Sequence, residues 1–80
     1  MYVITLIEKS SAGLKLSVYS ESLALVEESG YFNDTYTLNF YLQALARRHG
    51  IQKSLLVIHD KDRNTVDLSL ARDENSFFVS

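Results

Sequence analysis

The sequence contains no cysteine and no proline, and only three of its 80 residues are glycine. Without cysteine the chain forms no disulfide bond and no thiolate zinc site, and it has no thiol nucleophile. The glycines stand alone at positions 13, 30 and 50, so a glycine-rich phosphate loop is also missing. These absences exclude disulfide-rich secreted domains and P-loop nucleotide binding. They suit a reducing compartment, and we expect the cytoplasm.

Long apolar runs and a surplus of positive charge are missing as well. No stretch of the sequence approaches the roughly 20 apolar residues of a membrane-spanning helix, and no basic segment precedes the first apolar run as it would in a signal peptide. The formal net charge is −2, whereas nucleic-acid-binding domains usually carry a basic excess. We therefore expect a soluble protein without a membrane partner, for which nucleic acid is a secondary candidate partner.

The composition does supply enough apolar material for one small core. Hydrophobic residues make up 46% of the chain and charged residues 22%, a balance typical of globular proteins. A chain of 80 residues is too short for two cores, and no linker or internal repeat divides it. The sequence therefore predicts a single α+β domain over residues 1–80.

The clearest predicted element is a helix within the stretch Asn33–Gly50. Asn33, Asp34 and Thr35 can accept hydrogen bonds from the free N–H groups of a first helical turn, and Gly50 is typical of the residue that ends a helix. Apolar residues between these ends recur at the i, i+3, i+4, i+7 spacing of one helical face. The predicted buried stripe consists of Leu38, Phe40, Tyr41, Leu42, Ala44 and Leu45.

Four strands are predicted around this helix. Residues 2–7 (YVITLI) and 55–59 (LLVIH) are nearly continuous apolar runs, which are typical of central strands. Residues 14–19 (LKLSVY) and 65–71 (TVDLSLA) alternate between apolar and polar, as edge strands do when one face is buried. We expect a four-stranded antiparallel sheet with the chain order β-β-α-β-β and the spatial order 2-1-3-4, with the helix packed on one face.

This arrangement leaves one sheet face without a helix. We expect Val66, Leu68 and Leu70 to point toward the core. A partner or a second copy of the chain could occupy the other face. The residues expected on that uncovered face are Tyr2, Lys15, Ser17, Tyr19, Asp67 and Ser69.

Residues 20–32 fit a short helix and a strand almost equally well. We favour one or two helical turns ending at Gly30, because Glu27, Glu28 and Ser29 resemble a helix tail and cap more than strand residues. The segment Lys9–Gly13 is expected to form a hairpin loop of about five residues.

One segment resembles a metal-binding motif. Asp60–Asn64 places Asp, Asp and Asn at alternate positions, as in the first half of an EF-hand calcium loop. However, Thr65 stands where that loop needs glycine, and Ala71 stands where it needs a bidentate glutamate. We therefore predict a polar hairpin turn stabilised by Asx side chains, with no metal.

No catalytic arrangement is evident in the sequence. His49 and His59 have no nucleophile-elbow motif near them, and their spacing does not match a metal-ligand pattern. We expect no enzyme activity and no cofactor.

Aromatic and acidic residues gather just before and within the start of the predicted helix. Exposed tyrosines ringed by carboxylates are typical of protein-binding hot spots that select a basic partner. The sequence therefore predicts a non-enzymatic protein-binding module, most naturally an inhibitor of a larger protein or ribonucleoprotein complex. The predicted partner-binding residues are Glu27, Glu28, Tyr31, Asp34 and Tyr36.

Two further possibilities stay open. Residues 1–46 hold two basic and five acidic side chains, whereas residues 47–63 hold five basic and two acidic ones, so a nucleic-acid-binding patch is the alternative interpretation. Phe77 and Phe78 either join the core or mediate self-association, which leaves a homodimer open. The residues of the alternative nucleic-acid-binding patch are Arg47, Arg48, Lys53, Lys61 and Arg63.

With YVITLI and LKLSVY before the helix and LLVIH and TVDLSLA after it, this small acidic chain resembles phage-encoded inhibitors of the anti-CRISPR type. The resemblance implies a protein that blocks a CRISPR surveillance complex by masking a nucleic-acid channel or locking a subunit. Such inhibitors share no motif, so the resemblance assigns no individual site residue. An antitoxin-like accessory subunit fits the same outline.

Overall fold

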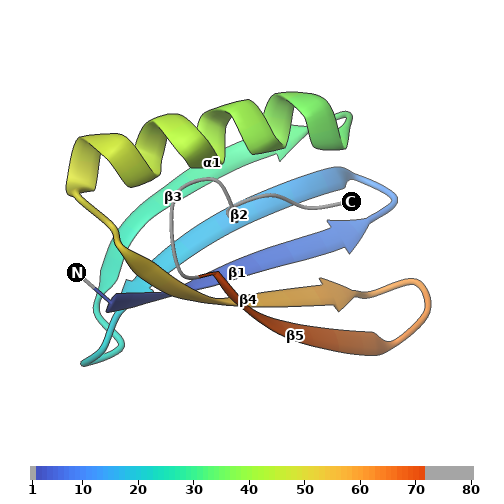
Figure 1. The fold of residues 1–80 in the computed structure, drawn as a ribbon. Coiled ribbons are helices and arrows are strands. Elements are labelled where there is room, and N and C mark those ends of the chain that lie inside the picture. Colours follow the sequence, from blue (N-terminus) through green and yellow to red (C-terminus); the bar gives the residue numbers. More distant parts are fainter. Residues whose placement is uncertain (1, 72–80) are drawn as a thin grey trace.

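A computed structural model describes residues 2–71, and within them one helix lies against one face of a five-stranded sheet (Figure 1). The α+β class and the helix on one face are thus confirmed. Phe77 and Phe78 lie outside the described residues. The elements are β1 Tyr2–Ser10, β2 Gly13–Ser20, β3 Leu25–Phe32, α1 Thr35–His49, β4 Lys53–Asp60 and β5 Thr65–Ala71.

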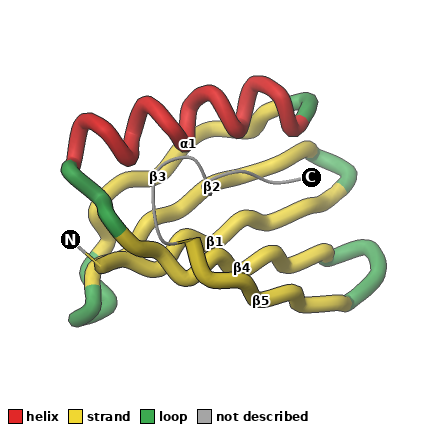
Figure 2. Tube along the Cα trace, viewed as in Figure 1, coloured by secondary structure: helices red, strands yellow, loops and turns green. Residues whose placement is uncertain are grey.

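The strands form a mixed sheet in the order β3-β2-β1-β4-β5. The four strands predicted from the sequence are β1, β2, β4 and β5, and they stand in the predicted order. The prediction of an entirely antiparallel sheet is wrong, because β1 and β4 pair in parallel. The reason is β3, which reverses the chain once more before the helix and so makes β4 run in the same direction as β1 (Figure 2).

Residues 25–32 form β3, so the helical turns predicted for this segment are wrong. Leucine and glutamate favour a helix locally, but the outer edge of β2 presents unpaired N–H and C=O groups that a further strand satisfies. Two register shifts in the β2–β3 pairing, one between Lys15 and Ser17 and one between Val18 and Tyr19, each add an extra residue to β3. These bulges break the strict alternation by which a strand is recognised in a sequence.

The ends of α1 are fixed by the predicted caps. The Asp34 carboxylate accepts a hydrogen bond of 2.7 Å from the Thr37 N–H, which satisfies one of the free donors of the first turn. At the other end Gly50 adopts the left-handed conformation, with φ 63°. The N–H of Ile51 then bonds to the Ala46 carbonyl at 2.9 Å, as in a Schellman motif.

The helix buries a narrower stripe than predicted. Leu38, Leu42 and Leu45 are fully covered by the sheet, whereas Phe40 and Ala44 point to solvent. Each residue turns the helix by about 100°, so Phe40 lies roughly 200° from Leu38, on the opposite side. The prediction that Phe40 joins the core is therefore wrong, and its side chain is 73% exposed.

The core lies between α1 and the facing side of β1, β2 and β4. One polar pair is buried there: the hydroxyls of Thr5 and Ser54 are 2.7 Å apart and satisfy each other across the parallel β1–β4 pair. The buried apolar residues are Val3, Ile7, Leu14, Leu16, Val18, Leu38, Leu42, Leu45, Ala46, Ile51, Leu56 and Ala71.

We call the opposite side of the sheet the open face. Paired residues on neighbouring strands point to the same side of a sheet, so the register defines this face. As predicted, Lys15, Ser17 and Tyr19 lie on it. Read from β3 to β5, its three central rows are Leu25, Tyr19, Ile4, Leu55 and Leu70, then Glu28, Ser17, Leu6, Val57 and Leu68, then Tyr31, Lys15, Glu8, His59 and Val66.

The two sides of β5 are the reverse of the prediction. Val66, Leu68 and Leu70 lie on the open face and not toward the core, with exposed fractions of 59%, 66% and 45%. Asp67 and Ser69, which were expected on the uncovered face, point to the helix side instead. That side is also uncovered at Asp67 and Ser69, although Ala71 at the end of β5 is buried, because α1 packs mainly against β2 and β3, and a helix about 10 Å wide spans only about two strands.

The first hairpin is tighter than expected. Only Ser11 and Ala12 separate β1 from β2, in place of a loop of about five residues. Gly13 follows them with φ +122°, and a Cβ atom at this position would lie 2.6 Å from the carbonyl oxygen of Phe32. Glycine is required here both for its backbone conformation and for the close approach of β3.

Candidate binding surfaces

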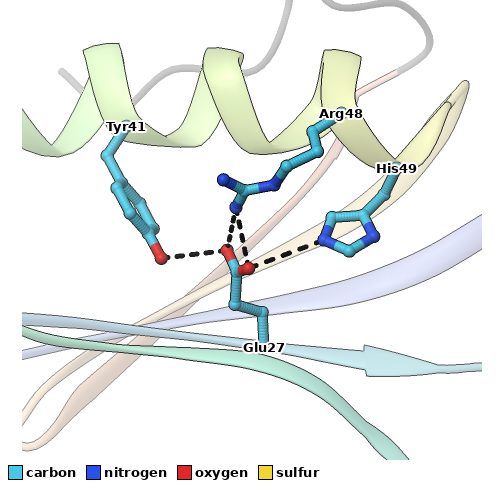
Figure 3. A network of polar contacts seen from close by, with 4 residues as sticks. All are labelled: Glu27, Tyr41, Arg48 and His49. Carbon is cyan, nitrogen blue, oxygen red and sulfur yellow. Dashed lines mark hydrogen bonds and ion pairs between the residues drawn. The ribbon is translucent and has the colours of Figure 1, made fainter.

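The best-defined polar cluster in the described residues joins β3 to the middle and the last turn of α1 (Figure 3). The Glu27 carboxylate accepts a hydrogen bond of 2.9 Å from the Tyr41 hydroxyl. Nη2 of Arg48 lies 2.7 Å from each of the two oxygens of the Glu27 carboxylate. Nε2 of His49 lies 3.5 Å from Oε1. We call these four residues the Glu27 network.

The network keeps Glu27 ionised. Partial burial alone would raise the pKa of this carboxyl group, but the Tyr41 hydroxyl, His49 and the positive charge of Arg48 outweigh burial and hold it below its usual value. Burial, together with the Glu27 carboxylate, raises the pKa of the Tyr41 hydroxyl. Both groups are therefore held in one protonation state at neutral pH, and the network acts as a tether between helix and sheet.

His49 is the incomplete member of the network. Its Nε2 atom is buried and has no hydrogen-bond partner among the described residues. The 3.5 Å separation from Glu27 is an ion-pair distance when the imidazole is protonated and is too long for a good hydrogen bond. His49 therefore makes no fixed hydrogen bond with Glu27, and it adds charge complementarity at the helix C-terminus only in its protonated form.

The predicted partner-binding residues do not form one cluster. Glu27 faces the helix within its network, whereas Glu28 and Tyr31 lie on the open face. There Lys15 forms an ion pair of 2.8 Å with Glu28 and stands 5.9 Å from the centre of the Tyr31 ring. The two glutamates are thus neutralised within the chain on opposite sides of the sheet.

The other two predicted residues lie at the start of the helix. The Asp34 carboxylate caps α1, and its hydrogen bond from Thr37 lowers the pKa of the acid. Tyr36 is 81% exposed and follows in the first turn. One turn later comes Phe40, which the sequence reasoning placed in the core. We call Tyr36 and Phe40 the aromatic pair.

The aromatic pair could have been found from the sequence. At about 100° per residue, Tyr36 and Phe40 lie within 40° of each other and on the side of the helix opposite Leu38 and Leu42. A stripe drawn only from the leucines would have left both aromatic residues at the surface.

The predicted basic patch is divided between the two ends of the sheet. Arg48 and Lys53 lie where α1 ends and β4 begins, and Arg48 is engaged by Glu27. Lys61 and Arg63 lie in the β4–β5 turn, where Lys61 pairs with Glu8 at 2.8 Å. An eight-residue strand separates the two groups, which corresponds to about 26 Å. A single continuous phosphate-binding surface does not result.

Arg47, the remaining member of that patch, lies in the last turn of α1, close to Arg48 in sequence. Its side chain is exposed on the helix surface. It belongs to the end of the sheet where β4 begins, far from the β4–β5 turn.

The turn after β4 has the predicted Asx geometry. Oδ1 of Asp60 accepts hydrogen bonds of 3.1 Å from the backbone N–H groups of Asp62 and Arg63. Asn64 completes the turn in the left-handed conformation, with φ 53°, which asparagine tolerates better than most residues. The alternating Asp and Asn residues therefore serve the hairpin turn.

These features define a small α+β domain with an aromatic helix surface on one side and an apolar sheet surface on the other. No protein-family model, curated protein or solved structure matches the chain. Within residues 2–71, no helix is both long and apolar enough to cross a membrane.

Proposed function

We propose that the protein is a non-enzymatic binding module that docks the outer face of α1 on a larger protein. The observation that carries the proposal is the exposure of Tyr36 and Phe40, at 81% and 73%, one helical turn apart on a rigid helix. Large aromatic side chains held in place by a scaffold give contact area at a small entropic cost. An i, i+4 aromatic pair on an exposed helix face matches the helix-in-groove mode of recognition.

The partner surface that fits this helix face is an apolar groove with a basic group at one end. Asp34 places a carboxylate next to Tyr36 at the start of α1, and it would face that basic group. Glu27 and Glu28 are neutralised within the chain, so Asp34 replaces them as the acidic element in the proposal. The acidic preference predicted from the sequence is thereby narrowed to one end of the helix.

The anti-CRISPR resemblance makes a ribonucleoprotein effector the first partner to test, and it would make this protein an inhibitor of that effector. The same surface would serve an antitoxin-like accessory subunit. Both interpretations involve a protein partner, so one set of variants of the aromatic pair tests the proposed docking surface for either.

The experiment is a pull-down from a lysate of the source organism with tagged wild-type protein, followed by mass spectrometry and a titration with the purified partner. We expect Tyr36→Ala and Phe40→Ala each to weaken binding by about 30-fold, which is the loss typical of a hot-spot aromatic residue. Tyr31→Ala is the matched control, because Tyr31 is also an exposed tyrosine, at 58%, but lies on the open face. Equal losses in all three variants, or a loss only in Tyr31→Ala, would rule out the helix surface.

A further inference from the structure

The open face carries an apolar patch that the proposed helix surface does not use. Four of its side chains are half-buried between their neighbours, and Leu68 and Leu70 project into solvent with exposed fractions of 66% and 45%. The patch extends over β1, β4 and β5, away from the polar half of the face at β3. Its six residues are Ile4, Leu6, Leu55, Val57, Leu68 and Leu70.

The alternation of apolar and polar residues in β5 places its leucines on the open face, although packing against the helix does not require this. Apart from its last residue, Ala71, which is buried, β5 is exposed on both sides, so packing against the helix does not dictate which side is apolar. The strand nevertheless puts Asp67 and Ser69 on the helix side and Leu68 and Leu70 on the open face. An edge strand exposed to water on both sides gains nothing from such an arrangement. An exposed apolar patch of this kind is typical of a surface that packs against another protein surface.

The charges around the patch are balanced within each chain. Lys61 pairs with Glu8, and Lys15 pairs with Glu28, each at 2.8 Å. These three acids and three bases carry no net charge, so net charge does not oppose contact with an identical surface across a twofold axis. The charged residues around the face are Glu8, Glu21, Glu28, Lys15, Lys53 and Lys61.

The size of the patch suits a dimer that dissociates on dilution. Its three strands, β1, β4 and β5, are spaced about 4.8 Å apart and roughly 26 Å long, so they cover about 370 Å² in plan, and the accessible area of the side chains on them is larger. Stable interfaces bury about 800 Å² per partner, and weaker complexes bury less. One open depression on this face is lined by Tyr2, Ile4, Glu21 and Lys53, and the face of one sheet can pack against the face of another.

We propose that the protein forms a homodimer in which the open faces of two copies pack against each other as a β-sandwich. The inference is independent of the proposed function, because it uses the opposite side of the domain. In this dimer both α1 helices remain on the outside, so two aromatic pairs are available to partners.

The rows of the open face select the orientation of the twofold axis. An axis across the strands would lay the apolar row containing Ile4 on the charged row containing Glu8. With an axis along the strands, each row of one chain faces the same row of the second chain, so apolar side chains meet apolar side chains. The patch is centred on β4, which places Val57 of each chain next to the axis.

The test begins with wild-type protein in sedimentation-velocity and light-scattering measurements across the micromolar range, where we expect a dimer that dissociates on dilution. Leu68→Lys should raise the dissociation constant by at least about 100-fold, because the interface contains the substituted residue twice. Phe40→Lys is the matched control: Phe40 is as exposed as Leu68 but lies on the helix, so the dimer should persist.

A wild-type protein that stays monomeric at every concentration overturns the proposal. This holds regardless of whether the open face is covered by another protein or by residues of the same chain outside the described range. Equal effects of Leu68→Lys and Phe40→Lys also overturn it. Circular dichroism of each variant shows whether the monomer is folded, and the wild-type measurement decides the question even if Leu68→Lys unfolds.

The absence of cysteine gives a direct test of the orientation. A spin label on the single-cysteine variant Arg63→Cys reports on the β4–β5 turn. With the axis along the strands, the two turns lie at the same end of the dimer, and the label distance should be shorter than the strand length of about 26 Å. A longer distance overturns this orientation.

Discussion

Replacing Glu27 by glutamine tests whether the Glu27 network ties α1 to the sheet. The substitution keeps the shape of the side chain and a carbonyl oxygen for the Tyr41 hydroxyl, but it removes the charge that Arg48 and His49 face. We expect the folded state to lose stability while the fold remains intact. The neighbouring substitution Glu28→Gln is the matched control.

The expected magnitude follows from the exposure of each partner. The side chain of Arg48 is 58% exposed, so its ion pair contributes at most about 0.2–1 kcal/mol. The Tyr41 hydrogen bond is partly buried, and exchanging its charged acceptor for a neutral one costs on the order of 1 kcal/mol. Glu27→Gln should therefore lower the free energy of unfolding by roughly 1–2 kcal/mol. Glu28→Gln should change it by less than about 0.5 kcal/mol, because only an exposed ion pair is lost.

Urea titrations followed by circular dichroism at one fixed protein concentration measure these differences. In a domain of this size, a loss of 1 kcal/mol also lowers Tm by about 4–8 °C. A double-mutant cycle with Tyr41→Phe isolates the hydroxyl–carboxylate contact, for which we expect a coupling of about 0.5–1.5 kcal/mol. The reasoning is refuted if Glu27→Gln is no more destabilising than Glu28→Gln, or if the effects of Glu27→Gln and Tyr41→Phe simply add.

Three further outcomes follow from the structure. Glu8 and Glu27 have lowered pKa values in the folded protein, from an ordinary value of 4.5. Their ionised carboxylates therefore contribute fully to the free energy of unfolding above about pH 4.5, and this contribution disappears as the pH falls through the folded-state pKa. A urea midpoint unchanged between pH 7 and pH 3 would contradict this. Gly13→Ala should cost about 2–3 kcal/mol through positive φ and a clash, whereas Gly30→Ala, with open space around its Cβ position, should be neutral or stabilising by up to about 1 kcal/mol in the same titration. Leu23 is 69% exposed with φ 66°, so Leu23→Gly should raise Tm by relieving about 1 kcal/mol of backbone strain, and a lower Tm would show that the leucine side chain is needed.

The candidate surfaces show the limits of reasoning from the sequence alone. Tyr36 was predicted to be exposed, and it is, because a residue in the first turn off the leucine stripe has no place to pack. Glu27 and Glu28 were grouped together because they are adjacent, but adjacent residues of a strand point to opposite sides of the sheet. Once residues 25–32 form a strand, one glutamate faces the helix and the other the open face.

The sequence by itself determined the elements whose signals are local. Asp34 and Gly50 set the ends of α1, since capping depends on a few neighbouring residues. Continuous and alternating apolar runs identified four strands and their order. Only the tertiary structure decided the rest. The free edge of β2 made a strand of residues 25–32, and that strand reversed the direction of β4 relative to β1. Alternation also shows which residues of β5 share a side, but not which side meets the helix. That depends on where a helix about 10 Å wide lies across a sheet of five strands.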